Sequence, residues 1–554
     1  MVAREVEILM GLLVAVAALV TLSRRTWIPY PVWLVLGGLA LAFIPGVPAI
    51  AMRPEIVFLV FLPPLLFRES INAPLSDFKT NARSIFSLAV GLVLATTVVV
   101  AWVAHRLIPG MTWPAAFVLG AVLAPTDEVA VTEVAERLSV PRRAMAVLEG
   151  ESLINDAISL VAYRMAITAA VTNAFSLGRG ALQFLAVSLG GVAIGLGVGW
   201  LVALLRRRLH DPPVENTISL LTPFAAYVPA DAIGVSGVLS VVTIGLYLGR
   251  LSPRLISSRV RLQVQVMWEM IAFLLNGLLF ILTGLQIRLI LHAKQMGPLG
   301  PVLGYTAVLI LTLIAIRFVW LFVTAYLTRA LIPGLRRRDP YPPWQQLFLV
   351  SWTGIRGGLS LVAALAIPFT IAGGVPFPNR SLIIGISFFV ILATLLLQGL
   401  TLPWLIRLLR LDQDGSHERE EDEETRARLV AARAALNRLE ALRARHGGRR
   451  SKRAPGVALD DLPPDQMKAA MLDDLRDRYV ERLHRYTARV KGDDDDFHED
   501  RDESYRKLRR DLLHAERDAV LKLRDEGRIS DDTLRRIQRD LDLDELRLTE
   551  PEQA

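Results

Sequence analysis

The 554-residue chain is 53% hydrophobic, 21% charged and free of Cys, which excludes disulfides, zinc–thiolate sites and cysteine nucleophiles and is more apolar than an ordinary soluble domain. Residues 1–411 contain 31 Lys and Arg and 17 Asp and Glu, whereas residues 412–554 contain 31 and 37, so the formal net charge of +8 is +14 in the first part and −6 in the second. The basic excess lies in loops between apolar runs, which argues against nucleic-acid binding and predicts a membrane domain over 1–411 with a water-soluble tail over 412–554.

Apolar runs long enough to cross the hydrocarbon of a bilayer, about 20 residues each, recur through the first part. The first run follows a start that lacks a positively charged region, which favours a spanning helix over a cleaved signal peptide. The third run is short and contains Pro63 and Pro64, which predicts a tilt or a bend. We predict an all-α polytopic protein with about thirteen transmembrane helices near residues 6–22, 27–44, 54–67, 84–105, 112–135, 144–171, 181–205, 216–231, 235–249, 262–287, 300–328, 344–368 and 381–406.

The loops between these runs predict the orientation. Loops on one side contain 19 Lys and Arg, and those on the other side, with the N-terminus, contain 7. Because positively charged loops stay in the cytoplasm, we expect an outside N-terminus and a cytoplasmic tail in the plasma membrane. Apolar residues at helical spacing predict tail helices over 424–446 and 504–523, with linkers at 448–464 and 493–496.

The fifth segment has polar residues in the middle of an apolar run. Pro125 lacks a backbone donor, and Thr126, Asp127 and Glu128 follow it directly. A helix interrupted there exposes carbonyls and half-helix ends, which a membrane tolerates only against protein or a cavity. Transporters build ion sites in this way; a loop between two short helices is the alternative.

The sixth segment carries three acids, Glu149, Glu151 and Asp156, together with Ser152 and Asn155. At 100° per residue Ser152 and Asp156 share a helix face, whereas Glu151 lies about 140° from Asp156. One acid can therefore face an aqueous cavity while the other pairs inside the bundle. Glu149 is expected to reach the membrane interface, and a structural hydrogen bond is the alternative role for Asp156.

Two later segments contain buried arginines. Arg317 is the single charge of the eleventh segment and keeps its proton, so it needs a carboxylate partner, for which Glu151 is the natural candidate. Binding of anions along a pathway is the alternative. Gly354 and Gly357 interrupt the twelfth segment around Arg356. Two interrupted helices, seven segments apart, predict an inverted-repeat transporter with its site between the interruptions.

These residues resemble the NhaP/NHE-like cation:proton antiporter family. The resemblance covers the whole membrane domain and implies a thirteen-helix fold with crossed, unwound fifth and twelfth helices, a homodimer, and alternating access of an elevator-like kind. It is carried by FLPPLLF near residue 61, APTDEVAV at 124–131, EGESLINDA at 149–157, WEMIAFLLNGLLFILTGLQ at 268–286 and GIRGGLSL at 354–361.

The resemblance also implies roles for the polar residues of the fifth and sixth segments. Asp156 is the carboxylate that binds the cation and the proton in turn. Asn155 precedes it in the Asn–Asp pair typical of electroneutral members. Thr126, Asp127 and Ser152 help to shape or coordinate the ion site.

Other residues are expected to support this site. Glu151 and Arg317 match the family's buried ion pair, and Arg356 matches the arginine of its Gly-x-Arg-Gly stretch. Many members have Pro after Thr-Asp, where this chain has Glu128 and hence an extra acid. The residues expected to support the interrupted helices are Pro125, Glu128, Arg356, Gly354 and Gly357.

We expect a secondary active transporter that exchanges a monovalent cation for H⁺ by alternating access, is electroneutral, and serves pH homeostasis. Na⁺ is the first candidate, and K⁺ or Li⁺ the alternative. A proton and a hard cation compete for Asp156, and oxygen ligands from Thr126 and Ser152, with water, suit such an ion. No cofactor is expected; the expected partners are the ions, membrane lipid and a second copy of the chain, and no nucleic acid.

Two other classes of protein are possible alternatives, and one glycine-rich helix face has two possible packing partners. A cation channel could use the same acids, although two interrupted helices suit alternating access better. An intramembrane enzyme is disfavoured because the sequence has neither an H-E-x-x-H nor a Gly-x-Ser-x-Gly motif. Gly191, Gly195 and Gly199 lie on one helix face, which favours close packing, either within the chain or between two chains.

Overall fold

The computed structural model describes residues 2–445 apart from 46–49, 51, 74, 139, 173–176, 210, 256–257, 293–295, 332–340, 372–373 and 412–415, and a few residues between 472 and 487. Contacts divide the chain into two units, Met1–Asp414 and Gly415–Ala554. The second unit contains the described helix α21 (Ser416–Arg445). The tail helix predicted at 504–523 and both predicted linkers lie outside the described residues.

The first unit is built of helices, and the prediction of an all-α fold is confirmed. Helices occupy the predicted apolar segments, and seven of those described are long and apolar enough to cross a membrane, by length and composition. The elements are α1 (Val2–Ser23), α2 (Tyr30–Ala42), α3 (Pro54–Ile56), η1 (Val57–Phe61), α4 (Leu62–Asn72), α5 (Leu75–Phe86), η2 (Ser87–Leu92), α6 (Val93–Leu107), α7 (Trp113–Leu123), α8 (Val129–Leu138), α9 (Arg142–Thr172), α10 (Leu177–Arg206), α11 (Pro212–Ala232), α12 (Gly237–Leu255), α13 (Ser258–Leu285), α14 (Ile287–Leu291), α15 (Leu299–Phe322), η3 (Val323–Leu327), α16 (Thr328–Leu331), α18 (Trp344–Trp352), α19 (Gly358–Leu365) and α20 (Arg380–Leu408).

Neighbouring residues explain two of the π-helical turns, η1 and η2. The turn η1 directly precedes Pro63 and Pro64, whose rings displace the carbonyls four residues before them and whose missing N–H groups break the regular ladder. In η2 the carbonyl of Ser87 accepts a 3.1 Å hydrogen bond from Nε1 of Trp320. Gly91 leaves room for that indole, because a Cβ there would lie 2.6 Å from it.

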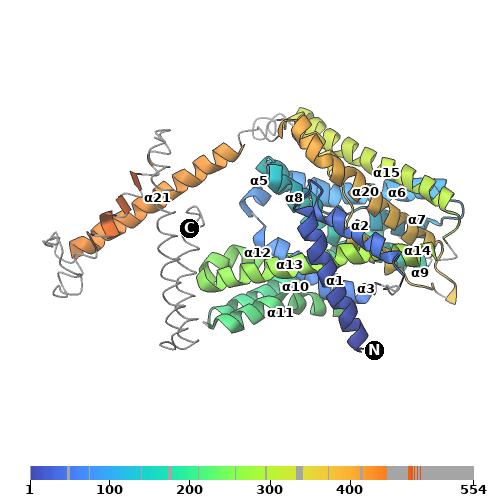
Figure 1. Ribbon diagram of the computed structural model, residues 1–554, viewed down its shortest axis with the longest axis horizontal. Coiled ribbons are helices and arrows are strands. Elements are labelled where there is room, and N and C mark those ends of the chain that lie inside the picture. The colour runs from blue at the N-terminus through green and yellow to red at the C-terminus, as the bar shows by residue number, and fades with distance from the viewer. Residues whose placement is uncertain are drawn as a thin grey trace. The chain divides into compact units, whose positions relative to one another are not determined.

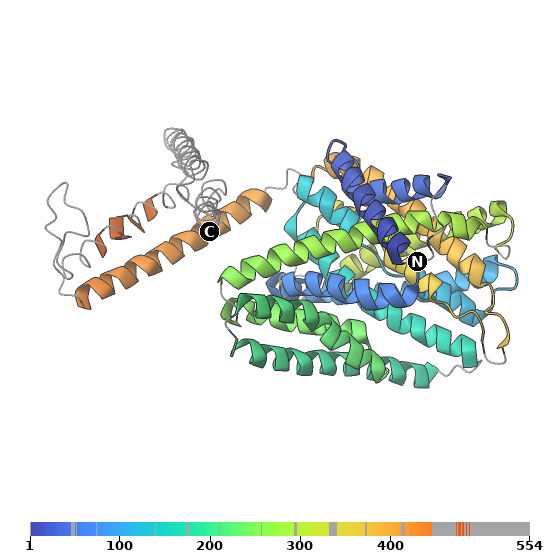
Figure 2. The same cartoon turned by 60° about the horizontal axis from the view of Figure 1, so that its bottom comes forward.

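Small residues bring several helices into close contact. A side chain at Gly38 of α2 would overlap the Ile281 carbonyl of α13, and one at Gly284 of α13 would overlap α2. Gly191 and Gly195 of α10 face the backbone of Ser236 and α12 in the same way. The glycine face of α10 is therefore buried within the chain, and α10, α11 and α12 lie side by side along one edge of the unit (Figures 1 and 2).

The apolar core consists of two large clusters. One joins α1, α2, α6, α7, α15, α19 and α20. The other joins parts of α4 and α9 to α11, α12 and the first half of α13. Because α4, α9 and α13 contribute to both clusters, the polar side chains on these three helices lie where the clusters meet.

Candidate ion-binding site

The two interrupted helices meet at their interruptions. Residues 124–128 separate α7 from α8, and residues 353–357 separate α18 from α19. The backbone N–H of Asp127 donates a 2.8 Å hydrogen bond to the carbonyl of Ile355, which joins the first interruption directly to the second. Gly357 permits this approach, because a Cβ at that position would overlap the Asp127 side chain.

Charged side chains of opposite sign stabilise two of the half-helix ends. Oδ1 of Asp127 accepts a 2.9 Å hydrogen bond from the N–H of Val129, at the positive N-terminus of α8. The buried Arg356 donates from Nε to the carbonyl of Leu123 at 3.0 Å, at the negative C-terminus of α7, and from Nη1 to the carbonyl of Gly354. Arg356 therefore holds together the ends of two interrupted helices.

Glu128 begins α8 through its backbone. Its carbonyl accepts 2.8 Å hydrogen bonds from the N–H groups of Val131 and Thr132. Among the described residues its own N–H has no hydrogen-bond partner, and one oxygen of its carboxyl group is buried without a partner. The side chain does not line the cavity described below.

Glu151 of α9 and Arg317 of α15 form a buried, bidentate ion pair. The guanidinium donates to the two carboxylate oxygens at 2.5 and 2.8 Å, and both side chains are no more than 3% exposed. Nε of Arg317 donates to the carbonyl of Val350 at 3.0 Å, and the hydroxyl of Thr126 donates to Glu151 at 3.1 Å. The charge on Glu151 is thus compensated and its oxygens are engaged.

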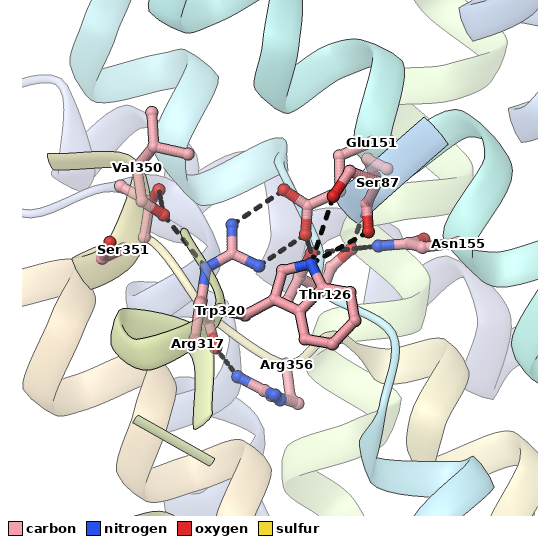
Figure 3. A network of polar contacts seen from close by, with 12 residues as sticks. Ser87, Thr126, Glu151, Asn155, Arg317, Trp320, Val350, Ser351 and Arg356 are labelled. Atoms are coloured by element: carbon pink, nitrogen blue, oxygen red, sulfur yellow. Dashed lines mark hydrogen bonds and ion pairs between the residues drawn. The ribbon is translucent and has the colours of Figure 1, made fainter. Parts of the chain in front are cut away.

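Thr126 is held from the other side by α9. Nδ2 of Asn155 donates to the Thr126 carbonyl at 3.1 Å and approaches the Thr126 hydroxyl at 3.0 Å. The Ser152 hydroxyl reaches the same carbonyl at 3.4 Å. Figure 3 shows Glu151 and Thr126 between Arg317 and Asn155. Asn155 does not line the cavity, so its contribution is to position Thr126.

A cavity of about 30 Å³ lies beside the joined interruptions, room for about two water molecules. Asp156 lines it, and the carboxylate of Asp156 makes no hydrogen bond to any described residue. Of the residues predicted for the ion site or its support, those that line the cavity are Pro125, Thr126, Asp127, Ser152, Asp156 and Gly357.

Three polar residues of the cavity wall were not among the predicted site residues: Glu69 of α4, Asn276 of α13 and Ser360 of α19. Glu69 has a weak signal, an acid just beyond the short third segment, and Asn276 is a lone amide in an apolar run. With Asp127 and Asp156, Glu69 makes a wall of three carboxylates and several neutral oxygens, which are ligands for hard cations. These carboxylates line the cavity without forming a chelate, because within the described parts of the chain no three His, Asp or Glu side chains are grouped closely enough to hold one metal ion.

Comparison with known proteins agrees with this architecture. A family model described as the transmembrane region of sodium/hydrogen exchangers matches residues 11–408. An uncharacterized Na⁺/H⁺ exchanger of Mycobacterium tuberculosis is 38% identical over 554 residues, 99% of this chain and 97% of the relative. A sodium, potassium, lithium and rubidium/H⁺ antiporter of Bacillus subtilis is 37% identical over 391 residues, 68% of this chain and 58% of the relative.

A solved structure shares the fold. The sodium proton antiporter MjNhaP1 of Methanocaldococcus jannaschii superposes with a TM-score of 0.58 at 20% sequence identity, over 74% of this chain and 99% of that protein. At this identity the likeness concerns the fold alone, and the predicted antiporter fold is confirmed.

Proposed function

This chain belongs to the sodium/hydrogen exchanger family, and from that membership we propose that it exchanges Na⁺ for H⁺ across the plasma membrane by alternating access. It is a transporter and not an enzyme. One observation carries the proposal: the Asp156 carboxylate faces a small cavity, without a hydrogen-bond partner among the described residues, beside two joined helix interruptions. A carboxylate in that situation can hold either a proton or a cation.

The proposed mechanism is competition at Asp156. In its ionised form the carboxylate binds Na⁺, with further oxygens from Glu69, Asp127 and water in the same cavity. In its protonated form it carries no charge and releases the cation. Glu151 keeps Arg317 as its counter-ion throughout, so Asp156 is the acid that changes its partner in this mechanism. One Na⁺ therefore replaces one H⁺, and the exchange is electroneutral.

The oxygens of the cavity wall suit more than one monovalent cation. The cavity wall offers carboxylate and neutral oxygens, which accept Na⁺, Li⁺ and K⁺ alike. The name of the Bacillus subtilis relative includes potassium, lithium and rubidium besides sodium. K⁺/H⁺ exchange by the same site is therefore the second candidate, and the experiment below compares the two cations.

We also propose the topology and the roles of the two parts. Residues 1–411 form the antiporter domain of a homodimer, with the N-terminus outside the cell, and residues 412–554 form a cytoplasmic tail that regulates exchange. The excess of Lys and Arg in alternate loops supports this orientation. The composition of the tail, 68 charges in 143 residues, supports its place in water.

The test uses purified protein in liposomes that contain a pH-sensitive dye. Na⁺ and then K⁺ are added, with and without a proton ionophore, to the unmodified protein, to Asp156→Asn and to Glu269→Gln. Glu269 is a suitable control because it is an exposed acid of α13 that accepts a hydrogen bond from Gln265 and does not line the cavity at Asp156. We expect cation-dependent proton movement that is lost in Asp156→Asn and kept in Glu269→Gln.

Two results would contradict the proposal. Exchange retained by folded Asp156→Asn would remove Asp156 from the site. A cation current would contradict electroneutral exchange, and one that reverses at the equilibrium potential of the cation, whatever the pH gradient, would identify a channel.

A further inference from the structure

A second cavity, of about 40 Å³, lies against α9 beyond Asp156, toward the end of the helix at Thr172. Leu160 and Tyr163 of α9 line it, with Phe58 of η1, Tyr227 of α11 and Val238 of α12. It shares no lining residue with the cavity at Asp156. Nothing in the exchange mechanism above uses it.

The two cavities lie in line along one pair of antiparallel helix segments. On α9, Asp156 lines the first cavity, and Tyr163, two turns or about 10 Å further along nearly the same face, lines the second. On the η1–α4 segment the order is reversed, because Glu69 lines the first cavity and Phe58 the second. Both cavities therefore belong to a single seam between α9 and this segment.

Apolar side chains separate the two cavities along that seam. Leu160 follows Asp156 by one helical turn, and the fully buried Leu62 lies one turn from Phe58 toward Glu69. Both leucines belong to the apolar core around α4, α9 and α12. A narrow apolar layer of this kind stops ions by excluding water.

The second cavity has the chemistry of a water-filled space. The side chain of Tyr163 is 7% exposed, and its buried hydroxyl has no hydrogen-bond partner in the part of the chain that the structure describes. Buried polar groups of this kind are ordinarily satisfied by water. Beside Tyr163, Nη2 of Arg164 lies 2.6 Å from Oδ1 of Asp231, and these side chains are 47% and 45% exposed. This ion pair joins α9 to α11, and Arg164 itself lines the cavity.

We propose that the second cavity is the extracellular chamber of the ion route to Asp156, and that the Arg164–Asp231 ion pair holds it closed. The inference rests on the proposed exchange and on the proposed orientation, which places the Thr172 end of α9 outside. A hydrated cation or proton enters the chamber when α9 moves relative to α11 and the ion pair separates. It reaches Asp156 once the Leu160 layer opens.

The absence of Cys from the sequence gives a direct test, because any thiol introduced is the sole one in the chain. Val238→Cys places it in the chamber wall, and Val187→Cys is a second wall variant should the first fail to fold. Leu189→Cys is the matched control, because Leu189 lies within the apolar span Gly180–Arg206, where its 66% exposed side chain faces lipid and not water, and it lines neither cavity. The probe is Ag⁺ in chloride-free buffer, a monovalent cation that reacts with thiolates.

Ag⁺ is added to intact cells and, separately, to inside-out vesicles. Thiols left unmodified are then counted with a fluorescent maleimide on the unfolded protein. We expect external Ag⁺ to consume the wall thiol and to spare Leu189→Cys. Adding Asp231→Asn should speed the external reaction about two- to fivefold, because an exposed ion pair makes only a small contribution to stability.

Either of two results would overturn the inference: wall thiols protected from external Ag⁺ with and without Asp231→Asn, or wall thiols modified only in inside-out vesicles. The thiol readout requires no transport. If the unmodified protein fails to exchange ions in liposomes, the proposed function fails while the labelling pattern still reports on the chamber. If exchange is present and the wall thiols stay protected, only this inference fails.

Discussion

Asn155 and Thr126 are joined through a single amide nitrogen, which lies 3.1 Å from the Thr126 carbonyl and 3.0 Å from its hydroxyl. The same hydroxyl donates to Glu151, the partner of Arg317. Thr126 is therefore the point at which the cavity wall is tied to the buried ion pair. Asn155 acts through Thr126 as a positioning residue, although it is the immediate neighbour of Asp156 in the chain.

A first prediction concerns the order of two substitutions. Asn155→Ala removes two contacts to Thr126, whereas Ser152→Ala removes one longer contact of 3.4 Å. We expect Asn155→Ala to raise the KM for Na⁺ about tenfold, as for the loss of buried hydrogen bonds, and Ser152→Ala to raise it less. Concentration series in liposomes measure both. A larger effect of Ser152→Ala would mean that its hydroxyl binds the ion directly.

The buried ion pair gives a second prediction, on stability. Arg317→Met leaves the Glu151 carboxylate buried without its counter-ion, which costs about 3–5 kcal/mol. The double variant Glu151→Leu/Arg317→Met leaves no orphan charge and should be more stable than Arg317→Met alone. Thermal midpoints of the purified proteins in one detergent give the comparison. An equal loss in the single and double variants would contradict a role of this pair in folding.

A third prediction tests the contact between the interruptions. A Cβ at Gly357 would overlap the Asp127 side chain, so Gly357→Ala should force the two interruptions apart. We expect a loss of about 1–3 kcal/mol in stability, as for other overpacked sites, together with a strong fall in exchange. Gly304→Ala is the control, because Gly304 lies in a helix with nothing within 4 Å of its Cβ position. Unchanged exchange in Gly357→Ala would show that the interruptions tolerate separation.

A fourth prediction concerns Glu128, the residue directly before α8. Its N–H has no hydrogen-bond partner among the described residues, so Glu128→Pro removes no bond and should keep both stability and exchange. Thr132→Pro is the contrast, because the N–H of Thr132 donates to the Glu128 carbonyl at 2.8 Å. It should destabilise α8 by about 3 kcal/mol. Loss of exchange in a stable Glu128→Pro would instead assign its carboxylate a part in transport.

The interruptions and the acids of the sixth segment could be predicted from the sequence because charges at bilayer depth are rare and costly. Helix geometry predicted that Ser152 and Asp156 share a face, and in the structure both line the cavity. The same geometry turns Asn155 by 100° from Asp156, away from that face. Its support of Thr126 depends on where a second helix crosses α9, which a one-dimensional pattern does not contain.

The remainder of the cavity wall could not be predicted for a related reason. Glu69, Asn276 and Ser360 come from three helices far apart in the chain. Each is an isolated polar residue whose local sequence fits an interfacial or packing role as well. The packing of α4, α13 and α19 around one cavity brings all three to Asp156. The closed, internal packing of Gly191 and Gly195 likewise depended on the position of α12.

The hydrogen bond between the Asp127 N–H and the Ile355 carbonyl involves main-chain atoms alone. Of the twenty residue types, only proline at position 127 would remove its donor. Alanine at position 127 or 355 therefore keeps both atoms of this hydrogen bond, and the alanine substitution expected to separate them is Gly357→Ala, which crowds the approach of the two interruptions. Substitutions in the cavity wall can therefore change the ion preference without breaking the backbone hydrogen bond that joins the two interrupted helices.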